Sequence, residues 1–378
     1  MVLFDNCYSF YELLCVTEKN KNKQMNKRLL IINSGGDCPG MNAVIWAIVK
    51  RATQEDDWEV IGSINGFDGI LSEPFNIEML DRKKVSGIHV KGGTILKTNN
   101  KRNPFSYPVL QEDGEIKNED LSDKLILNLK ILRVDAIIHI GGNQSHKISI
   151  ELHKKGVDII GIPKTINNDL SITDYAFGFQ TAAQVATDAV DKLVTTATSH
   201  NRILILEVMG RKAGWIALHA AIAGGADVCL IPEIPFSIDK VVKKIKSRYV
   251  NGKGFANIIV AEGACPKGKV CEIIPGLNAR KLSAELKKHE LDADIRETIL
   301  GHLQRGGTPN AFDRILATEL GVQAVELVLN NTFGVMVAHQ QQKLIPVPFS
   351  QVIDKDNQIN LNGNLIKTAR GVGISFGD

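Results

Sequence analysis

The sequence predicts an α/β protein built from two doubly wound domains with parallel central sheets. Short apolar runs alternate along the chain with longer stretches of helical pattern, the order typical of βαβ units. The runs are continuously apolar rather than alternating, as in strands that are buried on both faces. They span residues 29–32, 60–64, 136–140, 159–162, 203–208, 228–231 and 258–261. The length of 378 residues also favours two domains, or one large one, over a single small core.

The helical stretches between these runs carry their apolar residues at the spacing of one helix face. The clearest example is the set Ala182, Val185, Ala189, Val190 and Leu193. No low-complexity linker or short repeat interrupts the order. We expect the last part of the chain, residues 305–378, to cross back between the two domains.

The overall charge gives no sign of a nucleic-acid or membrane partner. The net charge is +3, which is too small to indicate either. Two basic clusters, at 19–28 and 243–248, are interpreted as solvated faces. No segment approaches the roughly 18 apolar residues that span a bilayer.

The cysteines favour a cytoplasmic protein. They are scattered, they match no C-x-x-C spacing, and several lie inside apolar runs, as reduced core thiols do. The six are Cys7, Cys15, Cys38, Cys229, Cys265 and Cys271.

Residues 1–24 differ in character from the rest. Their apolar part contains Asp5 and Glu12 and lacks a basic start, so the segment is a poor signal peptide. Met25 then precedes the first clean strand. We expect the functional fold to begin near Met25; the alternative is a short ordered tail or a helix on the surface.

Several unusual loops follow predicted strands directly. Ligands of doubly wound sheets bind at the carboxyl ends of the strands, so these loops are expected to face one cleft. Their sequences are GGDCPGMN after Ile32, GGNQS after Ile140, PKTINND after Ile162 and MGRKAGW after Val208.

Two of these loops and a third glycine pair suggest polyphosphate binding. Glycines let backbone N–H groups approach a phosphate, and a helix N-terminus adds partial positive charge. The loops at 34–40 and 141–145 each join a strand to a helix, and Gly92-Gly93 precedes KTNNKRNPF, where Lys101 and Arg102 are placed to meet phosphate charge. Each loop alone is also compatible with a plain turn or a solvated loop, but three together favour phosphate. None matches the dinucleotide or P-loop spacing.

With these loops gathered, the chain from about Met25 to Asp378 resembles the 6-phosphofructokinases. The blocks that carry the resemblance occur in the family's order: GGDCPGMNA, GGT, PKTINND, SHNRILILEVMGRKAGWIA and RETILGHLQRGGTPNAFDR. The loop KTNNKRNPF and the ending GISFGD are most similar to the bacterial branch that includes pyrophosphate-linked and mixed-donor members. A nicotinamide dehydrogenase is disfavoured because no G-x-G-x-x-G follows a strand. A lipid or NAD kinase would leave the RETILGHLQRGG block unexplained.

The resemblance implies phosphorylation of fructose 6-phosphate to fructose 1,6-bisphosphate by a cytoplasmic homodimer or homotetramer that uses Mg²⁺. It implies a phosphoryl-donor domain of residues 25–178 plus about 305–345, and a sugar-phosphate domain of about 179–304 plus 346–378. The sugar-phosphate pocket maps to Thr165, Asp169, Met209, Gly210, Arg211, Glu262, His302 and Arg305, with Arg202 and Arg296 reaching it from a neighbouring subunit. Arginine forks and a histidine suit a phosphate monoester, and a carboxylate suits sugar hydroxyls.

The same resemblance maps the donor site to Gly36, Lys101 or Arg102, Gly142, Asn143, Gln144, Ser145 and Lys164. In the family a glycine at the position of Gln144 leaves room for ATP, and a lysine at the position of Lys164 marks pyrophosphate users. The bulk of Gln144 and the charge of Lys164 favour pyrophosphate. Because Gln144 matches neither family pattern, ATP stays open as the donor.

The chain departs from the family at two carboxylates. Asn167 stands where the family keeps the aspartate that accepts the proton of the sugar's 1-hydroxyl, and an amide has no useful basicity near neutral pH. Asn143 stands where the family keeps a magnesium-linked aspartate, and it is the weaker ligand. Two rescues are open: Asp169 as the proton acceptor, and Asp37 as a metal ligand through water.

Two functions therefore remain open. One is a working phosphotransferase whose catalytic residues include Thr165, Asn167, Asp169 and Arg211. The other is a catalytically impaired sugar-phosphate-binding paralogue or regulatory subunit. A sequence error or a drifting gene copy would also account for the two amides.

Overall fold

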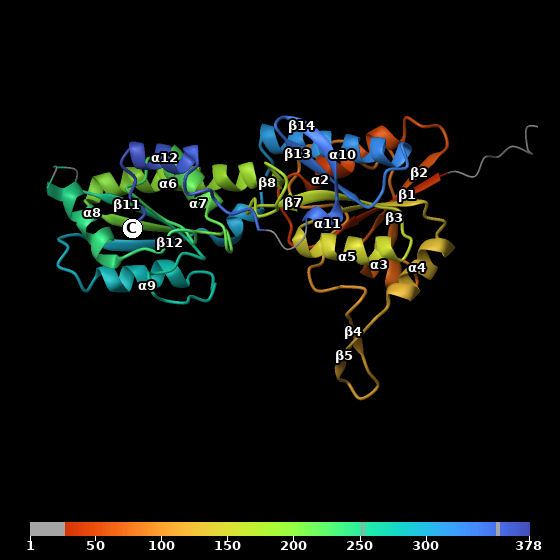
Figure 1. Cartoon of the computed structure of the whole chain (residues 1–378), viewed down its shortest axis with the longest axis horizontal. Coiled ribbons are helices and arrows are strands. Elements are labelled where there is room, and N and C mark those ends of the chain that lie inside the picture. Colours follow the sequence, from red (N-terminus) through yellow and green to blue (C-terminus); the bar gives the residue numbers. More distant parts are fainter. Residues whose placement is uncertain (1–26, 251, 253, 353–355) are drawn as a thin grey trace, which may run out of the picture.

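The computed structural model describes residues 27–250, 252, 254–352 and 356–378. The expectations for residues 1–24, including Cys7 and Cys15, lie outside the described residues. Two sheets, each covered by helices on both faces, lie side by side along the long axis of the molecule (Figure 1). The predicted two-sheet α/β fold is confirmed, and each of the seven apolar runs forms a strand.

The first sheet has the order β14-β13-β7-β6-β1-β2-β3, with β8 pairing beside the end of β7. Its central strands are parallel, while β3 and β14 pair antiparallel at the two edges. Gln341 and Gln342, in the tight turn between β13 and β14, both have positive φ, as a type I′ hairpin turn requires. The bounds are β1 Lys27–Asn33, β2 Trp58–Ser63, β3 Ile77–Met79, β6 Ala136–Gly141, β7 Ile159–Thr165, β8 Phe177–Gly178, β13 Val335–Gln340 and β14 Lys343–Pro348.

Helices cover both faces of this sheet. On one face, α10 packs against α2, and together they bury one apolar core (Figure 1). On the other face, α3, α4, α5 and α11 bury a second core. The bounds are α2 Met41–Ala52, α3 Asp68–Leu71, η1 Ile88–Val90, α4 Ser122–Ile131, α5 Asn143–Lys154, α10 Ala311–Leu329 and α11 Phe349–Val352.

The second sheet has the order β10-β11-β9-β12 and is parallel throughout. Helices α6, α7 and α12 cover one face and α8 and α9 the other (Figure 1). The bounds are α6 Phe179–His200, β9 Ile203–Val208, α7 Trp215–Ala223, β10 Val228–Leu230, α8 Ile238–Val250, β11 Ala256–Ala261, α9 Leu277–Leu286, β12 Ile295–Ile299 and α12 Asn364–Gly371. The chain returns to the first sheet through η2, Gly301–Arg305, and comes back again to α12.

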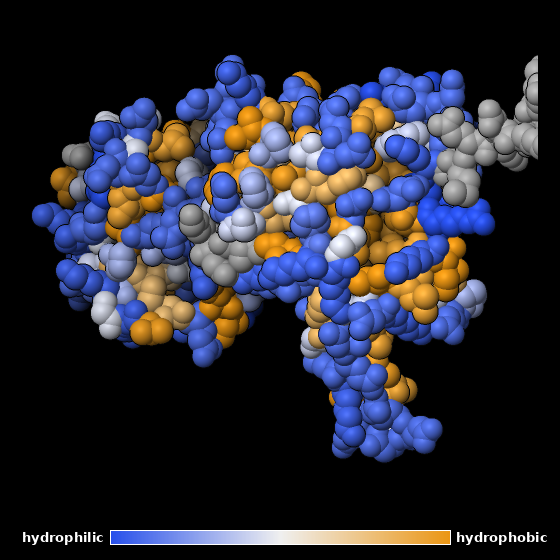
Figure 2. All heavy atoms as spheres, turned by 45° about the vertical axis from the view of Figure 1, so that its right-hand side comes forward, coloured by the Kyte–Doolittle hydropathy of each residue, from blue (hydrophilic) through white to orange (hydrophobic). Residues whose placement is uncertain are grey.

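One hairpin stands away from both sheets. Strands β4 (Tyr107–Leu110) and β5 (Ile116–Glu119) pair antiparallel and project from the first sheet's side of the molecule (Figure 1). Figure 2 shows the projection as mainly hydrophilic, although Leu110 and Ile116 are exposed cross-strand partners.

The surface features agree only in part with the sequence predictions. The basic cluster at 243–248 lies on α8: Lys243 and Lys246 are exposed, as a solvated face requires, whereas Arg248 pairs with the buried Asp227 and Lys244 donates to the Gly373 carbonyl. Among the described helices, none is long and apolar enough to cross a membrane.

The cysteine prediction is wrong for one pair. Cys38 and Cys229 are buried free thiols, as expected. Cys265 and Cys271 instead form a disulfide. They lie in the loop after β11, where neither is fully buried, and their separation of six residues matches no common redox or metal spacing, so the pattern search missed them.

Candidate functional site

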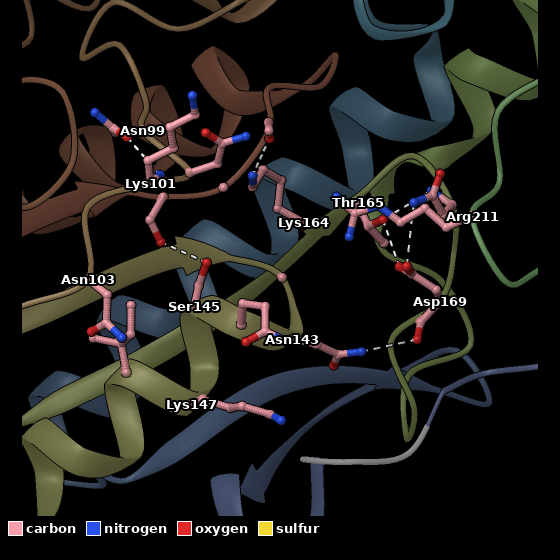
Figure 3. Close-up of a pocket in the computed structure, with 18 of the residues that line it drawn as sticks. Asn99, Lys101, Asn103, Asn143, Ser145, Lys147, Lys164, Thr165, Asp169 and Arg211 are labelled. Atoms are coloured by element: carbon pink, nitrogen blue, oxygen red, sulfur yellow. Dashed lines mark hydrogen bonds between the residues drawn. The ribbon is translucent and has the colours of Figure 1, made fainter. Parts of the chain in front are cut away.

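A cleft of about 880 Å³ opens at the carboxyl ends of β1, β6, β7 and β9. All four loops that the sequence places after these strands contribute to its wall, as expected for a doubly wound fold. From the predicted set, the structure brings together Gly36, Lys101, Arg102, Gly142, Asn143, Gln144, Ser145, Lys164, Thr165, Asn167, Asp169, Arg211 and Arg305. Figure 3 shows several of these side chains converging from different elements.

The loop after β1 gives backbone close access to the cleft. Gly35 has φ +84°, a conformation that favours glycine. A Cβ on Gly36 would lie 2.9 Å from Nη1 of Arg305, so a side chain there would push the guanidinium aside. Arg305 Nη1 donates a hydrogen bond of 3.1 Å to the Asp37 carbonyl, which fixes this cation at the cleft wall. The side chain of Asp37 does not line the cleft.

Helix α5 directs its first turn toward the same space. It begins at Asn143, and Gly142, Asn143, Gln144 and Ser145 all line the cleft. The first N–H groups of a helix lack partners within the helix, so this terminus favours an anion. Gln144 is an exposed residue of this cleft wall.

Lys164 is a buried cation at the end of β7. Its side chain is almost fully buried, and its ammonium group donates a hydrogen bond to the Gly36 carbonyl (Figure 3). Burial lowers the pKa of Lys164 to about 8, and Arg305 and Arg211 add repulsion. A phosphate in the cleft would supply the counter-charge that the site lacks.

Asp169 accepts hydrogen bonds from both the acceptor side and the donor side of the cleft. Thr165 Oγ1 donates to Asp169 Oδ1 at 2.8 Å, and Asn167 Nδ2 donates to Asp169 Oδ2 at 3.4 Å. From the donor side, Asn143 Nδ2 donates to the Asp169 carbonyl at 3.4 Å (Figure 3). Among these bonds, Asp169 therefore supplies the one side-chain carboxylate that contacts Asn167.

Both amides leave an oxygen without a partner. Asn143 Oδ1 and Asn167 Oδ1 are buried and accept no hydrogen bond from the described residues. The described residues contain no cluster of three His, Cys, Asp or Glu that would hold a metal on its own. Mg²⁺ commonly takes one or two protein oxygens and completes its shell with substrate phosphates and water. The free Asn143 oxygen fits a single neutral ligand of that kind.

Hydrogen bonds to Glu262 hold the loop after β9 in place. This carboxylate is buried, and its Oε1 accepts from the N–H of Arg211 at 2.7 Å and of Gly210 at 3.1 Å. Arg211 has φ +54°, and its side chain lines the cleft. Met209, Gly210 and Glu262 do not line the cleft themselves; they support the loop that presents Arg211.

The two predicted inter-subunit arginines lie together outside the cleft. Arg202 and Arg296 both contact Asp294 Oδ2, at 3.3 and 2.9 Å. Arg296 lies on β12, an edge strand of the second sheet whose side chains are mostly exposed, and 64% of its side chain is accessible. His302, in η2, is also exposed and outside the cleft.

The family assignment rests on a match that covers most of the described chain. Residues 28–328 match the family model described as Phosphofructokinase. This chain belongs to the phosphofructokinase family. As the sequence resemblance implied, it is therefore a phosphotransferase.

Phosphofructokinases of known name are similar along almost the whole chain. A Clostridium perfringens protein named ATP-dependent 6-phosphofructokinase 2 is 47% identical over 363 residues, covering 93% of this chain and 99% of that protein. One from Chloroflexus aurantiacus, named ATP-dependent 6-phosphofructokinase, is 44% identical over 93% of this chain and 98% of its own length. The structure of phosphofructokinase from Saccharomyces cerevisiae has a TM-score of 0.74 at 30% identity, over 86% of this chain and 45% of that one. A pyrophosphate-dependent phosphofructokinase from Nitrosospira multiformis shares the fold, with a TM-score of 0.75 at 21% identity over 93% of each chain.

Sequence reasoning missed part of this phosphofructokinase's cleft wall. Asn99, Asn100 and Asn103 line it beside Lys101 and Arg102, in a stretch whose density of amides was a usable signal. Two cations were missed as well. Lys147 lies four residues after Asn143 on the same face of α5, and Lys212 follows Arg211.

The pH dependence of the free energy of unfolding should reveal the lowered pKa of the buried Lys164. Between pH 8 and 10.5 the unfolded chain keeps the proton that native Lys164 releases, so stability rises with pH across this window. We expect the wild-type protein to gain about 2–3 kcal/mol in free energy of unfolding from pH 7.5 to pH 10, relative to Lys164→Met. Denaturant titrations of both proteins at the two pH values measure this difference. An equal pH dependence in the two proteins would mean that the amine is not desolvated.

Proposed function

We propose that this protein transfers a phosphoryl group to the 1-hydroxyl of fructose 6-phosphate, as a cytoplasmic enzyme of glycolysis. The observation that carries the proposal is the position of Asp169. Its carboxylate lies against Thr165 and Asn167 on one side, and its carbonyl contacts the donor-side Asn143 on the other. A hydroxyl bound there lies beside a base and faces the phosphate-binding loops.

The acceptor side needs somewhere for the hydroxyl proton to go. As the sugar oxygen bonds to the transferred phosphorus, the bond from phosphorus to the leaving oxygen breaks and the proton passes to a carboxylate oxygen of Asp169. Thr165 and Asn167 orient that carboxylate through hydrogen bonds.

The donor side supplies charge neutralisation. The N-terminus of α5, Lys164, Arg305 and Lys101 surround the space for the phosphates. Mg²⁺, held by Asn143 Oδ1 and the donor phosphates, would add a Lewis acid that spreads the phosphate charge. The remaining chemistry is positioning by the chain's own residues.

We propose ATP as the donor rather than pyrophosphate. The names of the relatives at 44–47% identity point to ATP. Both residues that favoured pyrophosphate line the cleft, but Gln144 matches neither family pattern and the Lys164 amine is hydrogen-bonded to the Gly36 carbonyl. Pyrophosphate stays the competing donor in the test.

We further propose a homodimer or homotetramer in which Arg202 and Arg296 bind the sugar phosphate of a neighbouring subunit. Arg296 lies on the exposed edge strand β12 and Arg202 directly precedes the neighbouring strand β9; both contact Asp294, away from their own cleft. Arg296→Ala should weaken fructose 6-phosphate binding by about 10-fold, the loss of one charge-assisted hydrogen bond. Lys243→Ala, on the exposed face of α8, is the matched control and should change nothing. Calorimetric titration of both variants measures the difference, and equal small effects would remove Arg296 from the pocket. A proven monomeric variant that keeps full affinity would count against the shared pocket.

The two unpaired amide oxygens favour one other function. In this second candidate, the protein binds the sugar phosphate without turning it over and assembles with an active paralogue. The anion-binding wall is intact here, whereas Asn143 and Asn167 replace the carboxylates. Such a protein would keep its affinity for fructose 6-phosphate and lack turnover.

The deciding experiment measures fructose 1,6-bisphosphate formation by purified protein, with ATP and with pyrophosphate in parallel, each with Mg²⁺. Turnover with ATP alone supports the proposal, and turnover with pyrophosphate alone reassigns the donor. Absence of turnover together with calorimetric binding of fructose 6-phosphate supports the second candidate. Absence of both would reject the sugar-phosphate pocket.

A further inference from the structure

His139 is a polar residue in the middle of an otherwise apolar strand. It lies in β6 directly beneath the donor side of the cleft and is fully buried. Its Nε2 lies 2.6 Å from Ser34 Oγ, and its Nδ1 lies 2.7 Å from Ser149 Oγ. A buried imidazole with both nitrogens engaged is held in one orientation, so this histidine has a defined direction relative to the cleft.

The ring is neutral in the folded protein. Burial holds the pKa of His139 well below its usual range, and repulsion from His146 and Lys164 acts in the same direction. A neutral imidazole has one N–H donor and one acceptor nitrogen. Which nitrogen carries the proton is therefore decided by the neighbouring hydroxyls.

The neighbouring serines fix the direction of the bonds. Ser34 Oγ donates its only proton to Ser145 Oγ at 2.7 Å. Ser149 Oγ has two acceptors within reach, His139 Nδ1 at 2.7 Å and the Ser145 carbonyl at 3.3 Å. The shorter contact assigns the Ser149 proton to Nδ1, so the bond between His139 and Ser34 is donated by Nε2–H. In the described chain, the Ser145 hydroxyl proton then remains unassigned, and Ser145 lines the cleft beside Gly142 and Gly35.

We propose that His139 is a positioning residue that directs the Ser145 hydroxyl at a phosphate oxygen of the phosphoryl donor through Ser34. The bonds from Ser149 to His139, Ser34 and Ser145 form one relay, in which each group donates its hydrogen bond toward the cleft. The proposal deepens the proposed function and rests on it for the identity of the ligand. The Ser145 hydroxyl at the end of the relay is a neutral hydrogen-bond donor next to the cationic Lys164. It gives the phosphate a directed hydrogen bond, whereas the lysine supplies a point charge.

The tautomer tests the relay without any ligand. In ¹⁵N spectra of histidine-labelled protein, His139 should carry its proton on Nε2 and stay neutral from pH 5.5 to pH 8. A proton on Nδ1, or a charged ring at pH 7, would overturn the proposal. This readout stands even if the wild-type protein transfers no phosphoryl group, so it separates failure of the relay from failure of the proposed function.

A double-mutant cycle tests the link to the donor. Calorimetry with Mg²⁺ and ATP, and separately with inorganic pyrophosphate, should show about 10-fold weaker binding for Ser145→Ala and about 5-fold for His139→Leu. In the presence of Ser145→Ala, the His139→Leu change should have no further effect, because the relay has lost its end. Fructose 6-phosphate affinity should stay unchanged in all three variants.

The matched control is His146→Leu. His146 is also fully buried and stacks on Phe349, but neither of its ring nitrogens bonds a serine of the relay. It should fold comparably and leave donor affinity unchanged. An equal loss of donor affinity in His146→Leu, or the same loss from His139→Leu with and without Ser145→Ala, would show a merely structural role.

Discussion

The Asn143→Asp/Asn167→Asp variant is expected to form fructose 1,6-bisphosphate faster than the wild-type protein, by at most the roughly 10²–10⁴-fold that a positioned general base contributes, because Asp169 already serves as a base in the wild type. The change places a carboxylate beside Asp169 Oδ2, where Asn167 Nδ2 now lies at 3.4 Å. Two carboxylates at that separation repel, which raises the pKa of one of them and makes it a better proton acceptor. At position 143 the new carboxylate gives Mg²⁺ a charged ligand in place of an amide oxygen.

Single variants separate the two contributions. Asn167→Asp should carry most of the increase in kcat, whereas Asn143→Asp should mainly lower the Mg²⁺ concentration required. Fructose 6-phosphate affinity should stay within about threefold, because the change adds no contact to the phosphate. A variant no faster than wild type, with both folded, would mean that the amides are not what limits the chemistry.

Replacing Asp169 by asparagine is expected to lower wild-type turnover by about 10²–10⁴-fold, equivalent to about 3–5 kcal/mol of barrier. Asp169 is the acidic side chain bonded to both Thr165 and Asn167, so Asp169→Asn leaves that cluster without a base. Donor affinity should change little, since the donor-side contact uses the Asp169 carbonyl.

The matched control for this prediction is Asp356→Asn. Asp356 is another carboxylate of the cleft wall, and it pairs through its backbone with Leu170. Its turnover should stay near the wild-type value. Comparable turnover in the Asp169 variant and the wild-type protein would exclude Asp169 as the proton acceptor, and thermal unfolding of both variants would exclude a folding defect as the cause of any loss.

The sequence was sufficient to predict the fold and the location of the cleft because both follow from local patterns. Continuous apolar runs mark strands buried on two faces, and a loop after such a run must emerge at one edge of a parallel sheet. Strand β12 was not predicted from the sequence because it contains no apolar run. It lies at the edge of its sheet, and four of its five residues are exposed. The hairpin strand β14 was missed for the same reason, since only one of its six residues is buried.

Contacts between distant residues were not predictable in the same way. The histidine in AIIHIG reads as one polar residue inside an apolar strand; its partner Ser34 lies 105 residues away. The bond from Arg305 to the Asp37 carbonyl joins residues 268 apart. Such pairs are decided by tertiary packing, which no single window of sequence contains. The Cys265–Cys271 pair is local, yet a spacing alone does not say that two thiols meet.

The order of strands in the two sheets has a consequence for the growing polypeptide during translation. The second sheet uses one continuous stretch, from β9 to β12, so it is complete as soon as residue 299 leaves the ribosome. The first sheet begins earlier in the chain, but one edge of β7 stays unpaired until β13 and β14 are made. Arg305, which bonds the loop after β1, is also made only after the second sheet's strands. Domains usually fold in the order of synthesis. In this protein the four strands of the second sheet can pair before the first sheet is closed, and the nascent first sheet must wait, with an unpaired strand edge, for β13 and β14. Helix α12, which covers one face of the second sheet, is made last.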